Sequence, residues 1–89
     1  MATATIELTK EEIVQRGKEI YYSEILPSIE AGNHGRVVAI DVLTGEFELA
    51  DDAIASSNQL RARLADPVIF FMRVGYPTMA RVLDRKSVV

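Results

Sequence analysis

Cysteine is absent from this 89-residue sequence, which excludes a disulfide framework and any metal site built on thiolates. Histidine occurs once, as His34 in the glycine-rich stretch AGNHG, and no spacing of acids around it is typical of a metal site. No apolar run approaches the roughly 20 residues that span a bilayer. The segment MATATIELTK lacks the basic and apolar regions of a signal peptide. We therefore expect a cytoplasmic protein with no membrane partner.

The usual signatures of nucleotide binding and hydrolysis are also missing. Gly32, Gly35, Gly45 and Gly75 form neither a GxGxxG nor a GxxxxGK pattern, so no phosphate-binding loop is indicated. The serine pair at 56–57 does not lie in a GxSxG elbow. The sequence therefore predicts a protein that is not an enzyme and that holds no cofactor and no metal.

What is present fits one small globular domain. Hydrophobic residues make up 48% of the chain and charged residues 26%, which is typical of globular proteins. A chain of this length buries roughly 60% of its unfolded surface, so its core is compact or is completed by a partner. We predict a flexible tail over residues 1–7, a single α+β domain over residues 8–84 and a frayed tail over residues 85–89.

Charge is distributed unevenly along the chain. Residues 1–58 carry four basic and eleven acidic residues, whereas residues 59–89 carry six basic and two acidic ones. The basic half suggests an alternative function, nucleic-acid binding, through Arg61, Arg63, Arg73, Arg81, Arg85 and Lys86. Tyr21, Tyr22 and Tyr76 could stack on bases. The acidic total, a formal net charge of −3, disfavours this reading.

A helix is predicted from residue 10 towards Pro27. Thr9 and Glu12 have the spacing of a capping box, and Leu8 and Ile13 that of a hydrophobic staple. Gly17 lies inside this helix, where glycine is unfavourable by up to ~1 kcal/mol. A close approach of another element at Gly17 would explain it. The proline should kink or end the helix.

Three segments of the sequence are predicted to form strands, one of them as a hairpin of two strands. RVVAIDVLTGEFELA, residues 36–50, reads as a β-hairpin with its first strand interior and its second nearer an edge. VIFFMRV, residues 68–74, is apolar on both faces, as expected for a central strand. TMARVL, residues 78–83, is the predicted fourth strand.

A second helix is predicted over residues 51–66, between the hairpin and the central strand. Asp51 is the expected N-cap, and Pro67 ends the helix. Its apolar stripe is thin, consisting of Ala53, Ile54, Ser57, Leu60, Arg61 and Leu64.

The resulting order is α-β-β-α-β-β, a small mixed or antiparallel sheet with helices mainly on one face. The other sheet face would then be exposed, and large exposed apolar patches usually mark interfaces. We therefore predict a homo-oligomer, with a dimer favoured, that associates through this sheet face. The alternative is a self-sufficient monomer whose first helix wraps around the sheet. The candidate interface residues are Val37, Ala39, Asp41, Ile69, Phe71, Arg73 and Tyr76.

Asp41 and Arg73 each interrupt an apolar strand. Buried charges are seldom unpaired, so an ion pair between them is expected on the shared face, within the chain or across an interface. A third reading, an enzyme using His34 and Asp41, requires both side chains to line one pocket.

The chain resembles a family of short bacterial α+β proteins at GRVVAIDVLTGEFEL, LRARLADPVIFFMRVGYP and TKEEIVQRGKEIYYSEILP. The family pattern has a G-[RK]-x-V-x-I-D-x-x-T-G-x-[FY]-E hairpin and a strand ending R-[VI]-G-Y-P. An R-x-R pair precedes that strand. The pattern is matched here at Gly35, Arg36, Val38, Ile40, Asp41, Thr44, Gly45, Phe47 and Glu48, at Arg61 and Arg63, and at Arg73, Val74, Gly75, Tyr76 and Pro77. Leu64–Pro67 departs from it, where a shorter junction is expected. The resemblance implies a fold and a bacterial, cytoplasmic setting, and no activity.

The sequence therefore favours a non-enzymatic protein-interaction module, a small regulatory or antitoxin-like component with an unidentified protein partner. Nucleic-acid binding is the alternative.

Overall fold

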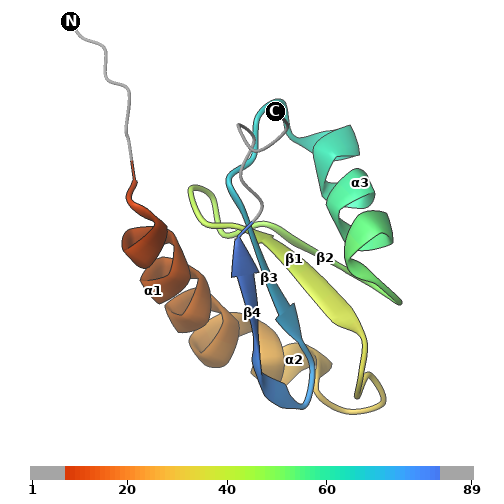
Figure 1. Ribbon diagram of the computed structural model, residues 1–89. Coiled ribbons are helices and arrows are strands. Elements are labelled where there is room, and N and C mark those ends of the chain that lie inside the picture. Colours follow the sequence, from red (N-terminus) through yellow and green to blue (C-terminus); the bar gives the residue numbers. More distant parts are fainter. Residues whose placement is uncertain (1–7, 83–89) are drawn as a thin grey trace, which may run out of the picture.

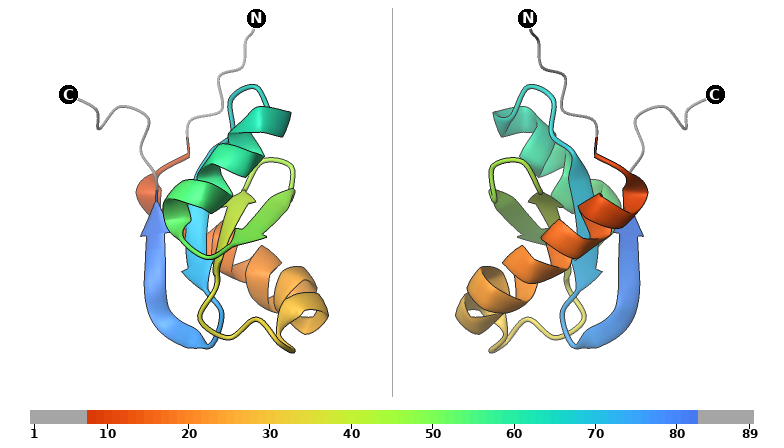
Figure 2. Two further views of the ribbon diagram at one scale, coloured as in Figure 1. Left: turned by 90° about the vertical axis from the view of Figure 1, so that its right-hand side faces the viewer. Right: turned by 90° about the vertical axis from the view of Figure 1, so that its left-hand side faces the viewer.

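The structure is a computed structural model that describes residues 8–82, with side chains described through residue 76. The predicted tails at 1–7 and 85–89 lie outside the described residues. The chain forms an α+β fold in which two helical units lie on opposite sides of one sheet (Figures 1 and 2). In chain order the elements are α1 Lys10–Ile20, η1 Tyr21–Ile25, α2 Leu26–Ile29, β1 Val37–Asp41, β2 Phe47–Ala50, α3 Ala53–Arg63, β3 Ile69–Arg73 and β4 Tyr76–Val82.

The sheet has four strands in the order β2-β1-β3-β4, and each neighbouring pair is antiparallel. The strands β1 and β3 are interior, as their apolar character on both faces predicts. The strand β2 lies at an edge, also as predicted. The expected order counted one N-terminal helix, whereas the structure has three consecutive helical segments there.

The N-terminal helix begins with the predicted capping box. The Thr9 backbone N–H donates to Glu12 Oε1 at 2.9 Å, and the Glu12 N–H donates to Thr9 Oγ1 at 3.1 Å. The helix widens into a π-helix, η1, immediately before Pro27. Proline has no N–H and clashes with the carbonyl of the fourth preceding residue. The π-helical segment therefore accommodates the proline, and the helix continues through Pro27 into α2. The structure thus has a local widening of the helix where the sequence predicted a kink or an end.

One side of the sheet packs against α1 and η1. Tyr21 and Ile25 from η1 join a buried cluster with the sheet residues Val38, Ile40, Val42, Phe70, Met72 and Val74. Gly17 of α1 lies on the Phe70 ring so closely that a Cβ at residue 17 would overlap it. The close approach predicted at Gly17 is therefore confirmed.

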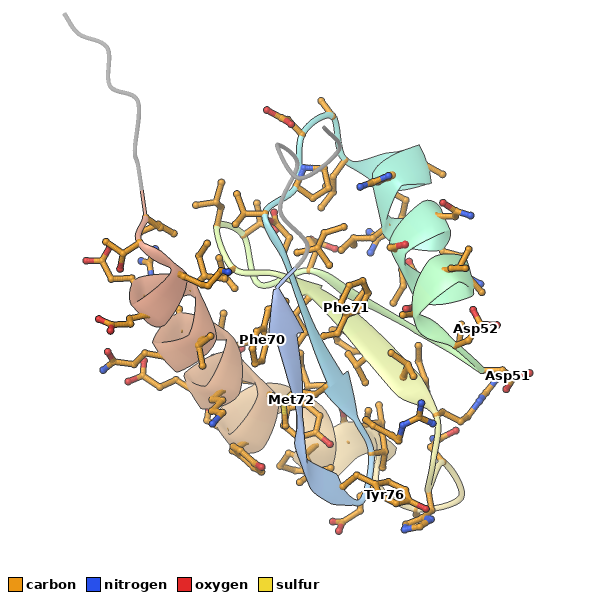
Figure 3. All side chains as sticks on the ribbon, viewed as in Figure 1. Asp51, Asp52, Phe70, Phe71, Met72 and Tyr76 are labelled. Atoms are coloured by element: carbon orange, nitrogen blue, oxygen red, sulfur yellow. The ribbon has the colours of Figure 1, made fainter. Side chains whose placement is uncertain are left out.

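The other side of the sheet packs against α3. Leu60 of α3 forms a second buried cluster with Val37, Ala39, Ile69 and Phe71. Figure 3 shows Phe70 and Phe71 on opposite sides of β3, one towards each helix. The prediction that the helices lie mainly on one face is therefore wrong. Two helices of 11 residues each, on opposite faces, cover the apolar residues of both interior strands.

Helix α3 differs in detail from its prediction. The N-cap is Asp52, whose Oδ1 accepts a hydrogen bond from the Ala55 N–H at 2.8 Å. Asp51 instead pairs with Arg36. The helix ends at Arg63, earlier than the predicted residue 66. Ile54, assigned to the apolar stripe, is 74% exposed.

None of the helices in the described range has the length and apolarity needed to cross a lipid bilayer.

Candidate functional site

A pocket of about 220 Å³ opens between the N-terminal helical unit and the turn that joins β3 to β4. Three tyrosines line it, Tyr21 and Tyr22 from η1 and Tyr76 from the start of β4. Figure 3 shows Tyr76 at the end of the sheet where this turn lies, and Figure 1 shows α2 beside that end. The remaining lining residues are Leu26, Glu30, Met72, Arg73 and Gly75.

The π-helix places the two adjacent tyrosines. The Leu26 N–H donates to the Tyr21 carbonyl, five residues back, which widens the turn that carries the tyrosines. Their rings meet edge to face, with centroids 4.9 Å apart. Tyr21 is buried against the core, whereas Tyr22 is 47% exposed. Single π-helical turns are frequent at functional sites, so this deviation supports a role for the pocket.

The loop between α2 and β1 is bound to the β3–β4 turn. The Gly35 N–H donates to the Val74 carbonyl at 2.8 Å, and the Val74 N–H donates to the Arg36 carbonyl at 2.9 Å. These bonds continue the pairing of β1 with β3 beyond the strand ends. They hold the backbone of the turn in place beside the pocket.

Side-chain contacts reinforce this junction. The His34 ring lies on Gly75 and is 5.0 Å from the Tyr76 ring, centroid to centroid. Gly75 has φ +86°, a conformation that favours glycine. The Arg73 Nη1 donates to the Gly35 carbonyl at 2.7 Å, and the Arg73 guanidinium carbon lies 5.9 Å from the Tyr76 ring centroid. His34 therefore has a packing role in the turn.

Burial raises the pKa of the Tyr21 phenol above its ordinary value, with smaller contributions from Tyr22 and Glu30. The phenol therefore stays protonated at neutral pH and offers the pocket a hydroxyl.

The raised pKa of Tyr21 predicts an alkaline loss of stability. The folded chain favours the neutral phenol. The contribution of Tyr21 to the free energy of unfolding is therefore fully present below about pH 10 and is lost as pH rises through the raised pKa. We expect the free energy of unfolding in urea to fall above about pH 10 in the wild type. Tyr21→Phe should fall less steeply, and Tyr22→Phe should keep most of the wild-type decline. An identical decline in the Tyr21→Phe and wild-type proteins would contradict the expectation.

The candidate interface residues divide into two groups. Five of them are buried within the chain, beneath α3 or in the β1–β2 turn, namely Val37, Ala39, Asp41, Ile69 and Phe71. They are not accessible to a second copy, so the argument for a dimer through this face loses its basis. Arg73 is half-buried and Tyr76 is 46% exposed, and both line the pocket.

The expected ion pair between Asp41 and Arg73 does not form within the chain. Both residues lie on the predicted face, but Asp41 is opposite Ile69 and Arg73 is opposite Val37, at the two ends of the β1–β3 pairing. Asp41 instead accepts hydrogen bonds from the Val68 N–H at 2.9 Å and from the Thr44 hydroxyl at 2.8 Å. Its carboxylate is therefore satisfied by the turn that follows β1 and by the backbone just before β3.

The same separation applies to His34 and Asp41. His34 lies beside Gly75 at one end of β1, and Asp41 is the last residue of β1 at the other end. They do not line one pocket, so the enzyme reading built on this pair is not supported. Within residues 8–76, no group of three or more histidine, aspartate or glutamate side chains has a metal-binding arrangement.

The basic residues of the nucleic-acid alternative are dispersed. Arg63 is bound to Glu48 at 2.7 Å and Glu46 at 2.8 Å, and its hydrogen bond to Glu46 raises the pKa of the guanidinium. Arg61 is exposed on α3, whereas Arg73 lies at the pocket. The side chain of Arg81 and the whole of Arg85 and Lys86 lie outside the described part of the chain. The three described side chains of this set thus have three different environments, one paired with acids, one exposed on α3 and one at the pocket.

The sequence identified part of the pocket for a different reason. Tyr21, Tyr22 and Tyr76 were grouped as aromatic rings for stacking on bases, and the structure brings all three together. Leu26 and Glu30 were missed. The signal that indicates them is Pro27, since a proline inside a helical pattern marks the site of a local widening.

Comparison of the chain with models of protein families, with curated proteins and with solved structures gave no match. The resemblance to short bacterial proteins stays a prediction.

Proposed function

We propose that the protein is a protein-interaction module and that its pocket receives one apolar side chain of a partner protein. The observation that carries the proposal is the convergence of Tyr21, Tyr22 and Tyr76 on one pocket beside Arg73. Tyrosine, methionine and arginine are enriched at protein interfaces, and tyrosine and arginine supply many of the residues that dominate binding energy. Met72 also lines the pocket but is fully buried, so the exposed aromatic surface of the pocket comes from Tyr22 and Tyr76.

The size of the pocket supports the same function. About 220 Å³ is smaller than the roughly 300–1,000 Å³ typical of pockets for cofactors and drug-sized ligands. It suits a single anchor side chain. The fixed backbone of the β3–β4 turn means that the pocket exists before a partner binds, which reduces the entropy lost on association.

The test is a selection from a random peptide library displayed on phage, with the folded protein as target. We expect enriched peptides that share an apolar anchor. Tyr22→Ala and Tyr76→Ala should weaken binding of these peptides about tenfold or more, as truncation of a central interface aromatic does. Leu43→Ala is the matched control, because Leu43 is 46% exposed, as Tyr76 is, and does not line the pocket.

Thermal unfolding of each variant confirms that it is folded before binding is compared. Peptides that bind both tyrosine variants as tightly as the wild type would overturn the proposal, as would a selection that enriches no binding peptide.

A further inference from the structure

The strand β2 lies at one edge of the sheet, and a side chain from α3 is bound to that edge. The strand order β2-β1-β3-β4 leaves the outer side of β2 without a neighbouring strand within residues 8–82. An edge of this kind presents unpaired N–H and C=O groups that a strand of another chain can bind. Helix α3 lies beside β2 (Figure 1), and Arg63 is its last residue.

The outward backbone groups of β2 belong to Phe47 and Leu49. The Asp41 N–H donates to the Glu46 carbonyl at 2.8 Å, so the backbone groups of Glu46 face β1. The pairing of β1 with β2 continues in one register up to residue 50. Backbone groups alternate in direction along an antiparallel strand. The N–H and C=O groups of Phe47 and Leu49 therefore point away from β1, towards the open side of the edge.

The Arg63 guanidinium occupies one of these outward groups. Its Nη2 donates to the Phe47 carbonyl at 3.2 Å. Its Nε donates to Glu48 Oε2 at 2.7 Å, and its Nη1 donates to Glu46 Oε1 at 2.8 Å. The two carboxylates come from the residues on either side of Phe47, so together they fix the guanidinium over the carbonyl. An incoming strand would find this acceptor already bound and a positive charge beside it.

We infer that Arg63 closes the outer edge of β2 against pairing with β2 of a second copy of the chain. A second copy fits this edge because an antiparallel strand related by a twofold axis presents the same outward groups at the same spacing. In that pairing two guanidinium groups would also meet at one edge, and like charges at an interface are unfavourable. The inference does not depend on the pocket or on its proposed function.

The test removes Arg63 without leaving two unbalanced acids on the strand. A double variant, Glu46→Gln with Glu48→Gln, keeps Arg63 and two side-chain oxygens that accept its hydrogen bonds. A triple variant adds Arg63→Ala and frees the Phe47 carbonyl. The mass of each protein is measured by light scattering after gel filtration, at concentrations up to about 1 mM. We expect the triple variant to reach about twice the mass of the wild type, and the double variant to keep the wild-type mass.

Amide hydrogen exchange locates the contact between the two copies. The outward N–H groups of Phe47 and Leu49 gain partners when two β2 strands pair. We expect both amides to exchange about tenfold or more slowly in the triple variant than in the double variant. The matched control replaces Arg61 by alanine in the same glutamine background, because Arg61 is an exposed arginine of the same helix. This control should keep the mass and the exchange rates of the double variant.

Three outcomes would overturn the inference. The first is a folded triple variant with the mass of the double variant at every concentration. The second is association without slower exchange at Phe47 and Leu49, which would place the contact on another surface. The third is an equal rise in mass in the double variant, which would assign the closed edge to the acids. Arg63→Met in the same background has a similar length and helix propensity without a donor, and should associate as Arg63→Ala does.

Discussion

Replacement of Gly17 by alanine lowers the stability of the protein, although the same replacement stabilises most helices. Alanine in place of a helical glycine is favourable by about 1 kcal/mol when the site has room. Here the added Cβ would overlap the Phe70 ring, which is fully buried in the core. Forcing an extra methyl into a packed interior is unfavourable by about 1–3 kcal/mol. Because the overlapped ring is fully buried, we expect the upper end of this range, which leaves a net loss of about 2 kcal/mol and a lower Tm by urea and thermal unfolding.

The control is Gln15→Ala in the same helix, where the side chain is exposed and the free energy of unfolding should change by less than about 0.5 kcal/mol. Phe70→Leu reduces the ring that alanine would meet. The double variant should therefore lose less stability than the sum of the two single losses. A Gly17→Ala protein as stable as the wild type would show that α1 moves away from β3 without loss.

Asp41→Ala should destabilise the protein strongly, although the side chain that it removes is small and polar. The Asp41 carboxylate is 3% exposed and accepts hydrogen bonds from the Val68 N–H, the Thr44 hydroxyl and the Leu43 N–H, the last at 3.3 Å. Hydrogen bonds to charged groups contribute about 1.5–3 kcal/mol each, and an orphaned buried donor adds its own desolvation penalty. We expect Asp41→Ala to lower the free energy of unfolding by about 3 kcal/mol or more.

Two other substitutions separate this effect from the loss of a charge. Asp41→Asn keeps an oxygen for the Val68 N–H and should lose about half as much stability. Asp51→Ala removes an exposed carboxylate whose ion pair with Arg36 lies at the surface, so its effect should stay below about 1 kcal/mol. An Asp41→Ala protein within 1 kcal/mol of the wild type would contradict the role assigned to the carboxylate, since about 1 kcal/mol is the effect of an ordinary substitution.

The features that the sequence predicted correctly depend on neighbours along the chain. The capping box needs only Thr9 and Glu12, and the hairpin needs the alternation around Thr44 and Gly45. The interior position of β3 follows from the unbroken apolar run in VIFFMRV. In each case the physical cause, a hydrogen bond or an alternation of faces, operates over a few residues and is visible in the sequence.

The features that were predicted wrongly depend on where distant segments meet. Nothing near α3 specifies which sheet face it covers, because its apolar stripe is thin and its buried residues include Ser56 and Ser57 beside Leu60. The expected pairing of Asp41 with Arg73 failed on register, since residues on one face of two paired strands can still lie at opposite ends. Asp51 and Asp52 are equally good caps by type, and only the backbone geometry distinguishes them.

The pocket falls between these two cases. In the sequence, its tyrosines and Arg73 are recognisable as residues with polar groups among apolar neighbours. Their convergence depends on the turn at Gly75 and on the widened helix before Pro27.

The strand order has a consequence for how the chain folds. The pairs β1–β2 and β3–β4 are local hairpins, whereas β1 meets β3 only after the chain has closed a long loop that contains β2 and α3. Loop closure of this kind is the entropic step that sets the folding rate of small sheets. The bonds between Gly35 and Val74 lie at the end of that seam. The pocket therefore assembles after this closure, and no partly folded chain with one hairpin alone displays it to a partner.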